Sequence, residues 1–373
     1  MIDRTIAHLI DERMFSGKTI LLMGARQVGK TTLLKKLQDK NNLPTLFLNA
    51  DLPIVRERLT NVGVEDLRTF LGDSKIVIID EAQRIKNIGL TLKVIHENFP
   101  DVQLIATGSS ALELANEINE PLTGRKWEFQ MFAISWKELV NSSNYFEAFD
   151  QLESRLLFGM YPAVLNNKGQ EREILNELSS SYLYKDLLSY QGIRKPQIIE
   201  KLLTALAFQV GSEVSYNELS RTLEIDKATV ENYISLLEKA FVIFRLQAFS
   251  RNLRNEINTS RKIYFYDNGI RNAIIDNFNP IGLRTDIGAL WENFLISERI
   301  KKNQNERVFA KNYFWRNHAQ QEIDYIEEGD GKISAFEFKW NPKAKSKFPN
   351  SFLETYSPEK TMVVSKENFH EFI

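Results

Sequence analysis

The chain has 373 residues, more than one ordinary hydrophobic core accommodates, so we expect two or three domains. Lysine and arginine (48) nearly balance aspartate and glutamate (49), and the net charge of −1 excludes a global basic field that would attract nucleic acid. The absence of cysteine excludes a disulfide framework and cysteine-based zinc sites.

The N-terminal sequence MIDRTIAHLIDER is charged throughout and lacks the apolar core of a signal peptide. No apolar run approaches the ~20 residues needed to cross a bilayer. We therefore expect a cytoplasmic protein that does not enter the membrane.

The first part of the chain alternates short apolar runs with helical periodicity. Residues 1–18 are predicted to form an amphipathic helix. Strands are predicted at 19–23, 45–49, 75–80, 102–107 and 127–135. Strands that are apolar on both faces and alternate with helices indicate an α/β fold, with a parallel sheet covered by helices.

Past residue 140 the pattern changes to successive helices, predicted over 146–158, 170–190 and 196–210. Two shorter helices are then predicted, with Asp226 as the cap of the second, and two strands follow. Their bounds are Tyr216–Leu223, Lys227–Lys239, Phe241–Phe249 and Lys262–Tyr266. In the last segment a helix is predicted at 286–302 and a polar loop at 341–350. Four strands are predicted there, at 308–316, 322–327, 333–340 and 360–365.

Gly24–Thr31 matches the pattern GxxxxGK[ST], after a predicted strand and at the start of a predicted helix. Glycines there let backbone N–H groups surround the phosphates of a nucleotide, and the helix N-terminus adds positive charge. Lys30 would reach the β- and γ-phosphates, and the Thr31 hydroxyl would bind Mg²⁺. A structural glycine turn is the alternative. The predicted nucleotide-binding residues are Gly24, Ala25, Arg26, Gln27, Val28, Gly29, Lys30, Thr31 and Thr32.

The strand at 75–80 ends in two carboxylates. Asp80 would hold Mg²⁺ through water, and Glu81 would polarise the attacking water. The alternative is that this pair caps the next helix.

The strand at 102–107 ends in Thr107, Ser109 and Ser110, which would sense the γ-phosphate; ordinary turn chemistry is the alternative. Arg125 is a candidate for stabilising the charge of the transition state, in its own subunit or on a neighbouring one. A surface arginine is the alternative.

Residues 212–270 have the proportions of a winged helix-turn-helix. The second helix would expose Lys227, Thr229, Asn232 and Tyr233 to DNA, but it also carries Glu231 and Glu238, which repel phosphate. The predicted wing is basic, with Arg245, Arg251, Arg254, Arg261 and Lys262. A DNA-binding module and a protein-interaction module therefore remain alternatives.

Asp324 lies on one predicted strand, and Glu337 and Lys339 lie two residues apart on the next, so these two share a face. This is the arrangement of PD-(D/E)xK nucleases. Asp324 and Glu337 would hold Mg²⁺, Glu292 would complete the metal site, and Lys339 would position or deprotonate a water. A cross-strand salt bridge without catalysis is the alternative.

Several segments together resemble bacterial and archaeal AAA+-type ATPases with a C-terminal DUF4143 domain. The N-terminal ones are GARQVGKTTLL, IIDEAQRI, IATGSSALEL and LTGRKWEFQMFAISWKE, and those similar to DUF4143 are KIYFYDNGIRNAI, GALWENFLISERI, EIDYI and AFEFKW. The resemblance covers nearly the whole chain. It implies an extra strand between the Gly-rich-loop strand and the Asp-Glu strand, a sensor at Thr107 or Ser109, and Arg125 in the arginine-finger region. Ala25 stands where proline is common, which removes rigidity but no ligand.

We therefore expect four regions, which are a P-loop AAA+-like ATPase domain at 1–140, a helical lid or linker at 141–211, a winged-helix module at 212–270 and a nuclease-like domain at 271–373. ATP and Mg²⁺ are the expected cofactors. Two functions remain open: an ATP-driven machine acting on DNA, and an ATP-dependent switch that binds a protein partner through an inactive nuclease-like scaffold. Homo-oligomers are compatible with both.

Overall fold

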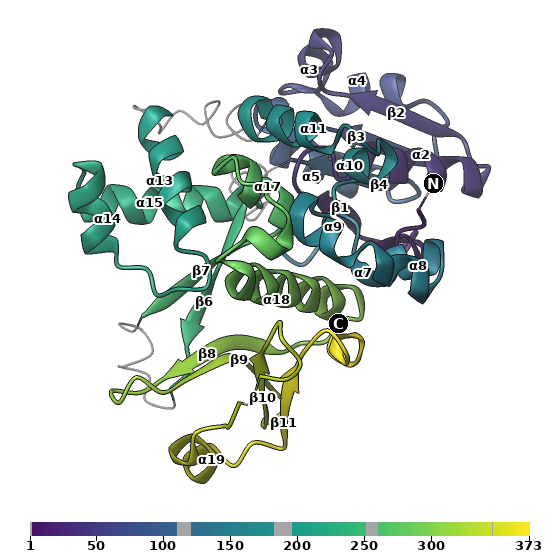
Figure 1. Ribbon diagram of the computed structural model, residues 1–373. Helices are drawn as coiled ribbons and strands as arrows, with labels where there is room; N and C mark the ends of the chain where they lie inside the picture. Colours follow the sequence, from purple (N-terminus) through teal and green to yellow (C-terminus); the bar gives the residue numbers. More distant parts are fainter. Residues whose placement is uncertain (1, 110–120, 183–195, 251–259, 345) are drawn as a thin grey trace. The chain divides into compact units, whose positions relative to one another are not determined.

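The computed structural model describes residues 2–109, 121–182, 196–250, 260–344 and 346–373 (Figure 1). The chain forms two compact units. The first comprises residues up to Ile134 and two short later segments, and the second comprises the rest from Ser135 onward. The first unit thus ends close to the boundary predicted at residue 140.

A five-stranded parallel sheet forms the centre of the first unit, in the order β2-β3-β4-β1-β5. Its strands are β1 (Thr19–Met23), β2 (Thr45–Asn49), β3 (Ile76–Asp80), β4 (Gln103–Gly108) and β5 (Lys126–Gln130). Every residue of β3 and β4 is buried, as a sheet covered on both faces requires. The predicted α/β fold is confirmed, and β4 lies between β1 and β3, where the family resemblance placed an extra strand.

Helices cover this sheet: α1 (Ile6–Asp11), α2 (Lys30–Asn41), α3 (Pro53–Leu59), α4 (Val64–Leu71) and α5 (Ile88–Asn98), with a 3₁₀ turn at Ala82–Arg84. Leu67, Leu92 and other apolar residues of α3 to α5 pack with Val77 and Ile79 of β3 in one buried cluster. The predicted helix at 1–18 is wrong in extent. It ends at Asp11, and Phe15 and Gly17 then adopt positive φ angles of 56° and 74° that a helix cannot contain.

The second unit begins with successive helices, as predicted. They are α7 (Trp136–Ser142), α8 (Tyr145–Asp150), α9 (Leu152–Phe158), α10 (Pro162–Asn166), α11 (Glu171–Glu177), a π-helical turn (Leu178–Tyr182) and α13 (Pro196–Phe208). The predicted helix at 170–190 continues past Tyr182 into residues outside the described part. The bounds predicted for α14 (Tyr216–Leu223) and α15 (Lys227–Lys239) are confirmed, and Asp226 accepts a hydrogen bond from Thr229 N at 2.8 Å as the predicted cap.

A six-stranded mixed sheet, in the order β11-β10-β9-β8-β6-β7, forms the rest of the second unit. Its strands are β6 (Ile243–Ala248), β7 (Arg261–Phe265), β8 (Lys311–Arg316), β9 (Glu322–Gly329), β10 (Lys332–Phe338) and β11 (Lys360–Val364). β6 pairs with β8 in parallel, through Gln247–Tyr313 and Ala248–Phe314. The two strands predicted as a wing therefore belong to the same sheet as the C-terminal strands, and this sheet runs across the boundary predicted at residue 270.

The long helix α18 (Ile287–Asn305) lies beside this sheet, with α17 (Asn268–Ile274) before it and α19 (Asn350–Tyr356) between β10 and β11 (Figure 1). Trp291 of α18 is fully buried and stacks on Phe294, with the ring centroids 5.8 Å apart. Short 3₁₀ turns at Ile281–Leu283 and Phe369–Glu371 complete the unit. Within the described residues, no helix is long and apolar enough to cross a membrane.

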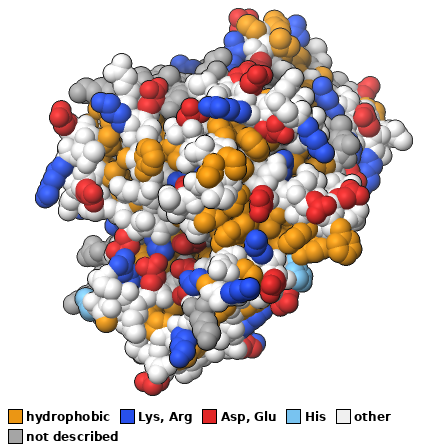
Figure 2. Space-filling model, viewed as in Figure 1, with side chains coloured by type: hydrophobic (Ala, Val, Ile, Leu, Met, Phe, Trp, Pro, Cys, Tyr) orange, Lys and Arg blue, Asp and Glu red, His pale blue; other side chains and the backbone are white. Residues whose placement is uncertain are grey.

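Basic and acidic side chains are interspersed on the face drawn in Figure 2, and neither kind gathers there in one large patch. This distribution agrees with the nearly equal numbers of basic and acidic residues in the sequence.

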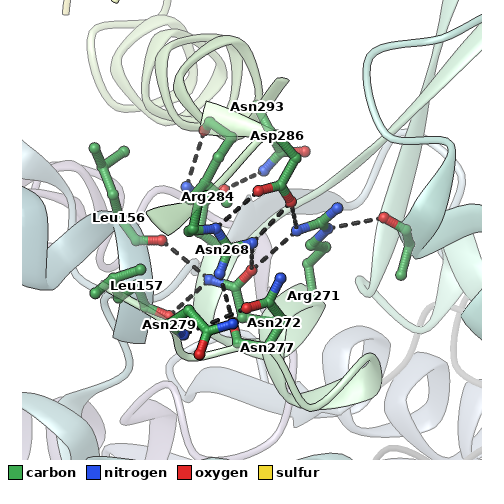
Figure 3. Close-up of polar contacts among 12 residues, drawn as sticks. Leu156, Leu157, Asn268, Arg271, Asn272, Asn277, Asn279, Arg284, Asp286 and Asn293 are labelled. Carbon is green, nitrogen blue, oxygen red and sulfur yellow. Dashed lines mark hydrogen bonds and ion pairs between the residues drawn. The ribbon is translucent and has the colours of Figure 1, made fainter. Parts of the chain in front are cut away.

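A buried polar network holds α17 in place (Figure 3). Arg271 and Arg284 both pair with Asp286, at 2.5 and 2.8 Å. Asn272 accepts hydrogen bonds from both arginines at 3.1 Å and donates to the carbonyls of Leu156 and Leu157 at the end of α9. One amide thus satisfies buried groups from three parts of the chain.

We expect Asn272→Ala to lower the free energy of unfolding by about 2 kcal/mol, because it leaves buried donors and acceptors unpaired. Urea unfolding measures this loss. Asn279 is exposed in the same region, and Asn279→Ala should stay within about 0.5 kcal/mol of the wild type. Equal losses in the two variants would show that the network contributes no more than a surface contact.

Candidate functional site

The Gly-rich loop connects β1 to α2, and its two glycines are required by its backbone. A Cβ atom at Gly24 would lie 2.1 Å from the carbonyl oxygen of Met131, so no side chain fits there. Gly29, which precedes α2, has a φ of 100°, in the left-handed region. Lys30 is buried, and its Nζ donates to the carbonyl oxygens of Gly24 and Ala25 at 2.7 and 2.9 Å. The lysine charge therefore lies within the loop, at the N-terminus of α2.

The remaining predicted loop residues lie around this charge. Val28 is buried, Arg26 is partly exposed, and Gln27 and Thr32 are exposed. Arg4 supports the loop from outside, donating to the carbonyl oxygens of Val28 at 2.7 Å and of Phe132 at 2.5 Å. Arg4 was not predicted as a site residue, because the residues that it contacts lie far along the chain.

Asp80, at the end of β3, is held by two hydroxyl groups. Thr31 Oγ1 donates to Asp80 Oδ2 at 2.7 Å, and Thr107 Oγ1 donates to Asp80 Oδ1 at 2.5 Å. Asp80 and Thr107 are buried. Oxygen ligands of this kind, a hydroxyl beside a carboxylate, are those that Mg²⁺ prefers. The predicted residues Thr31, Asp80 and Thr107 thus come together at one edge of the sheet.

Glu81 follows Asp80 with a φ of 54°, and its N–H donates to Thr107 Oγ1 at 3.0 Å. Its carboxylate accepts a hydrogen bond from Gln83 Nε2 at 2.7 Å, and the same nitrogen lies 3.0 Å from the buried Ser109 Oγ. Gln83 was not predicted as a site residue, although it lies only two residues after Glu81 in the sequence. Ser110, the third predicted sensor residue, lies outside the described part.

Arg125 lies at the opposite edge of the sheet from its own nucleotide site. Its carbonyl oxygen accepts from Thr19 N at 2.9 Å, at the start of β1, whereas the Gly-rich loop follows the end of β1. At about 3.3 Å per residue, these ends are roughly 15 Å apart. Its guanidinium, 44% exposed, pairs with Glu97 at 3.3 Å. The alternative in which Arg125 acts within its own subunit therefore disagrees with this position, and a role on a neighbouring subunit stays a prediction.

A second polar cluster lies on the mixed sheet of the second unit, where Asp324 of β9, Glu337 of β10 and Lys339, just after β10, come together. Asp324 Oδ2 accepts from Phe338 N at 2.7 Å. Lys339 Nζ donates to Glu337 Oε2 at 3.0 Å and lies 3.9 Å from Asp324 Oδ2. The arrangement expected from the Asp and Glu-x-Lys pattern is thus present.

Lys262 of β7 enters this cluster from the other end of the sheet. Its Nζ donates to Glu292 Oε1 of α18 at 3.2 Å and to Glu322 of β9. The hydroxyl of Tyr264 donates to the same Glu292 oxygen at 2.6 Å. Lys262 is 1% exposed, so its predicted place on a DNA-facing wing is wrong. The sequence does show that Lys262 and Tyr264 are two residues apart on a predicted strand, so that their side chains lie on one face and can reach the same partner.

The charges of this cluster compensate one another. Burial alone would lower the pKa of Lys262, but Glu292, Glu322 and Asp324 raise it above its usual value, so the ammonium stays charged. Burial raises the pKa of Glu292 to about 7, although Lys262 opposes this shift. Burial likewise raises the pKa of Asp324. The pKa of Glu337 is also raised, mainly by burial and to a lesser extent by the negative charge of Asp324.

The metal site predicted from Glu292, Asp324 and Glu337 is not assembled. Among the residues that the structure describes, no three acidic or histidine side chains converge on one metal position. The physical reason is that Lys262 and Lys339 occupy the carboxylate oxygens that a cation would need. A cleft of about 570 Å³ opens beside the cluster and is lined by Glu322, Glu337 and the polar loop before α19.

The predicted DNA-facing surface is largely engaged within the chain. Tyr233 is buried, so its predicted exposure is wrong, whereas Lys227 and Asn232 are exposed. Arg245 pairs with Glu238 at 2.5 Å, and the Arg261 guanidinium lies 4.3 Å from the centroid of the Tyr216 ring. Thr229 Oγ1 donates to Asp226 at 2.6 Å. Arg251 and Arg254 lie outside the described residues.

Three family models match the chain. Residues 16–140 match the family described as AAA domain, residues 149–281 match Domain of unknown function (DUF8612), and residues 287–372 match Domain of unknown function (DUF4143). Together, these matches cover both the nucleotide-site candidates and the second cluster.

Similar proteins come from bacteria and archaea. An uncharacterized protein of Haemophilus influenzae is 24% identical over 276 residues, which is 68% of each chain. Two uncharacterized proteins of Methanocaldococcus jannaschii are 23% and 26% identical, over 87% and 74% of this chain and 75% and 66% of their own lengths. A Pif1 helicase structure from Candida albicans covers 48% of each chain at 17% identity, with a TM-score of 0.28. By the family models, residues 16–140 are similar to an AAA domain, which is of the P-loop NTPase type, and residues 287–372 are similar to a DUF4143 domain.

Proposed function

We propose that the chain is an ATPase that binds ATP and Mg²⁺ at the Gly24–Thr31 loop. The observation that carries this proposal is the convergence of Lys30, Thr31 and Asp80 on one edge of the parallel sheet. The Lys30 ammonium and the N-terminus of α2 offer positive charge to phosphates. The oxygen atoms of Thr31 and Asp80 are suitable ligands for Mg²⁺. The residues present therefore fit both the nucleotide and the metal.

Each of these residues has a distinct part in hydrolysis. Mg²⁺, when bound, supplies positive charge that offsets the phosphate charge. Lys30 would bind the β- and γ-phosphates, and Glu81 would accept a proton from the attacking water. Thr107 and Ser109, at the end of β4, would contact the outermost phosphate. Arg125 would reach a nucleotide only from a neighbouring copy of the chain, because it lies at the other edge of its own sheet.

Phosphate release by the purified chain tests this proposal. We expect turnover of ATP in Mg²⁺ that EDTA abolishes and that is lost in Lys30→Ala. Turnover that persists unchanged in the Lys30→Ala preparation would place the activity elsewhere and contradict the proposal.

For the C-terminal half, we propose a nuclease-like scaffold that does not cleave nucleic acid. The whole chain would then act as a switch, in which ATP controls the binding of a protein partner. The element order α18, β8, β9, β10, α19, β11, with Asp324 and Glu337 on adjacent strands, supports a nuclease-like fold. Two lysines argue against cleavage, because Lys262 pairs with Glu292 and Lys339 pairs with Glu337, two of the three carboxylates that would otherwise hold the metal. The pairing of Arg245 with Glu238 likewise weakens the basic surface that DNA would need.

An ATP-driven machine that acts on DNA is the alternative function, and two measurements separate it from the protein-binding switch. We expect ATP turnover that is indifferent to added DNA, and no Mg²⁺-dependent cleavage of plasmid DNA. Salt-sensitive DNA binding with stimulated turnover would instead favour the machine. Cleavage that is lost in Asp324→Ala would do so as well.

A further inference from the structure

Gln83 connects the candidate general base to the end of β4. Its Nε2 donates to Glu81 Oε2 at 2.7 Å and lies at 3.0 Å from Ser109 Oγ. Gln83 belongs to the short 3₁₀ turn Ala82–Arg84, which brings its side chain back over Glu81.

Two unfavourable features lie at this contact. Glu81 adopts a left-handed φ of 54°, which a residue with a Cβ atom rarely takes up. Gln83 Oε1 is buried and has no hydrogen-bond partner among the described residues. Buried polar groups are normally paired, and exceptions gather at sites where geometry serves function.

The contact fixes one oxygen of the Glu81 carboxylate. An amide donor on Oε2 holds the side chain in one orientation and leaves Oε1 to accept a proton from water. A second tie holds the same residue, since Glu81 N donates to Thr107 Oγ1. The backbone of the base is thus attached to Thr107, and its side chain is attached through Gln83 to Ser109.

We propose that Gln83 is a positioning residue for ATP hydrolysis, which holds Glu81 in line for the attacking water and couples it to Ser109. This inference rests on the proposed ATPase function. A change at the tip of β4, where the outermost phosphate would lie, reaches the Glu81 carboxylate through one amide group.

Steady-state hydrolysis and ATP binding by Gln83 variants test the inference. We expect Gln83→Ala to lower kcat about tenfold, with the Kd for ATP and the melting temperature unchanged, because Gln83 touches the base and not the loop that binds phosphate. Gln83→Glu should lower kcat further, since a second carboxylate repels Glu81 and donates no hydrogen bond. The losses in kcat from Gln83→Ala and Ser109→Ala should be less than additive in the double variant, because both changes break the link between Glu81 and Ser109, although Ser109→Ala also removes a proposed contact with the outermost phosphate.

Arg84→Ala is the matched control. Arg84 lies in the same turn, and its exposed side chain pairs with Asp51 at 2.9 Å and not with Glu81; its kcat should stay within about twofold of the wild type. An unchanged or raised kcat in Gln83→Ala would overturn the inference, as would a loss confined to ATP binding or fully additive losses in the double variant. If the wild type does not hydrolyse ATP at all, the proposed function fails and this inference fails with it.

Discussion

Glu81→Gln should lower the rate of ATP hydrolysis by about 100-fold or more while ATP binding persists. The amide keeps the size of the side chain but cannot accept a proton from water, and general-base catalysis typically contributes at least that factor. Glu81 is held by Thr107 through its backbone and by Gln83 through its carboxylate, so the replaced side chain has a defined place to occupy. Single-turnover hydrolysis, measured beside equilibrium ATP binding, separates the two effects.

The comparison with Lys30→Ala completes this experiment. Lys30 lies within the loop and should support binding itself, so its loss should weaken both binding and turnover. A Glu81→Gln protein that hydrolyses ATP within a few-fold of the wild type would show that another group activates the water.

Lys262→Met should lower the free energy of unfolding by about 3 kcal/mol or more. The methionine keeps much of the volume of lysine but leaves the buried Glu292 without its counter-ion, whereas Glu322 keeps its pair with Arg316. Breaking one partner of a buried pair is strongly destabilising. Urea unfolding measures the change. Mn²⁺ or Mg²⁺ should restore part of the lost stability, because the carboxylate oxygens are then available to a divalent cation.

Lys332→Met is the matched control for this variant. Lys332 pairs with Glu359 at 2.9 Å, but its side chain is 66% exposed, and surface pairs of this kind contribute at most about 1 kcal/mol. A Lys262→Met protein as stable as the control, or wild-type protein that Mg²⁺ stabilises through Glu292 and Asp324, would contradict the assignment of Lys262 as the internal counter-ion.

The elements that local sequence fixes could be predicted. The strand before the Gly-rich loop, the two carboxylates after β3 and the helices α14 and α15 follow from apolar runs and capping residues close together in the chain. The meeting of Thr31, Asp80 and Thr107 follows from parallel strands, whose carboxyl ends share one edge of a sheet.

The features that the sequence missed depend on pairing between distant segments. Lys262 belongs to the acidic cluster only because β6 pairs with β8, across more than sixty residues of chain as their numbering shows. The contact of Arg4 with Val28 of the nucleotide loop likewise joins segments that are apart in the sequence. The place of Arg125 follows from the register of β5 on β1, which puts it at the edge away from the loop. Periodicity describes one segment at a time and contains no such information.

Titration of Mg²⁺-ATP into the wild type and into Lys30→Ala, followed by calorimetry, tests the central claim most directly, because it needs no turnover. The geometry of the Gly24–Thr31 loop predicts saturable binding of one nucleotide per chain to the wild type, and binding weakened at least tenfold in Lys30→Ala. The absence of binding to the wild type, or equal binding by the two proteins, would contradict the assignment of this loop as a nucleotide site.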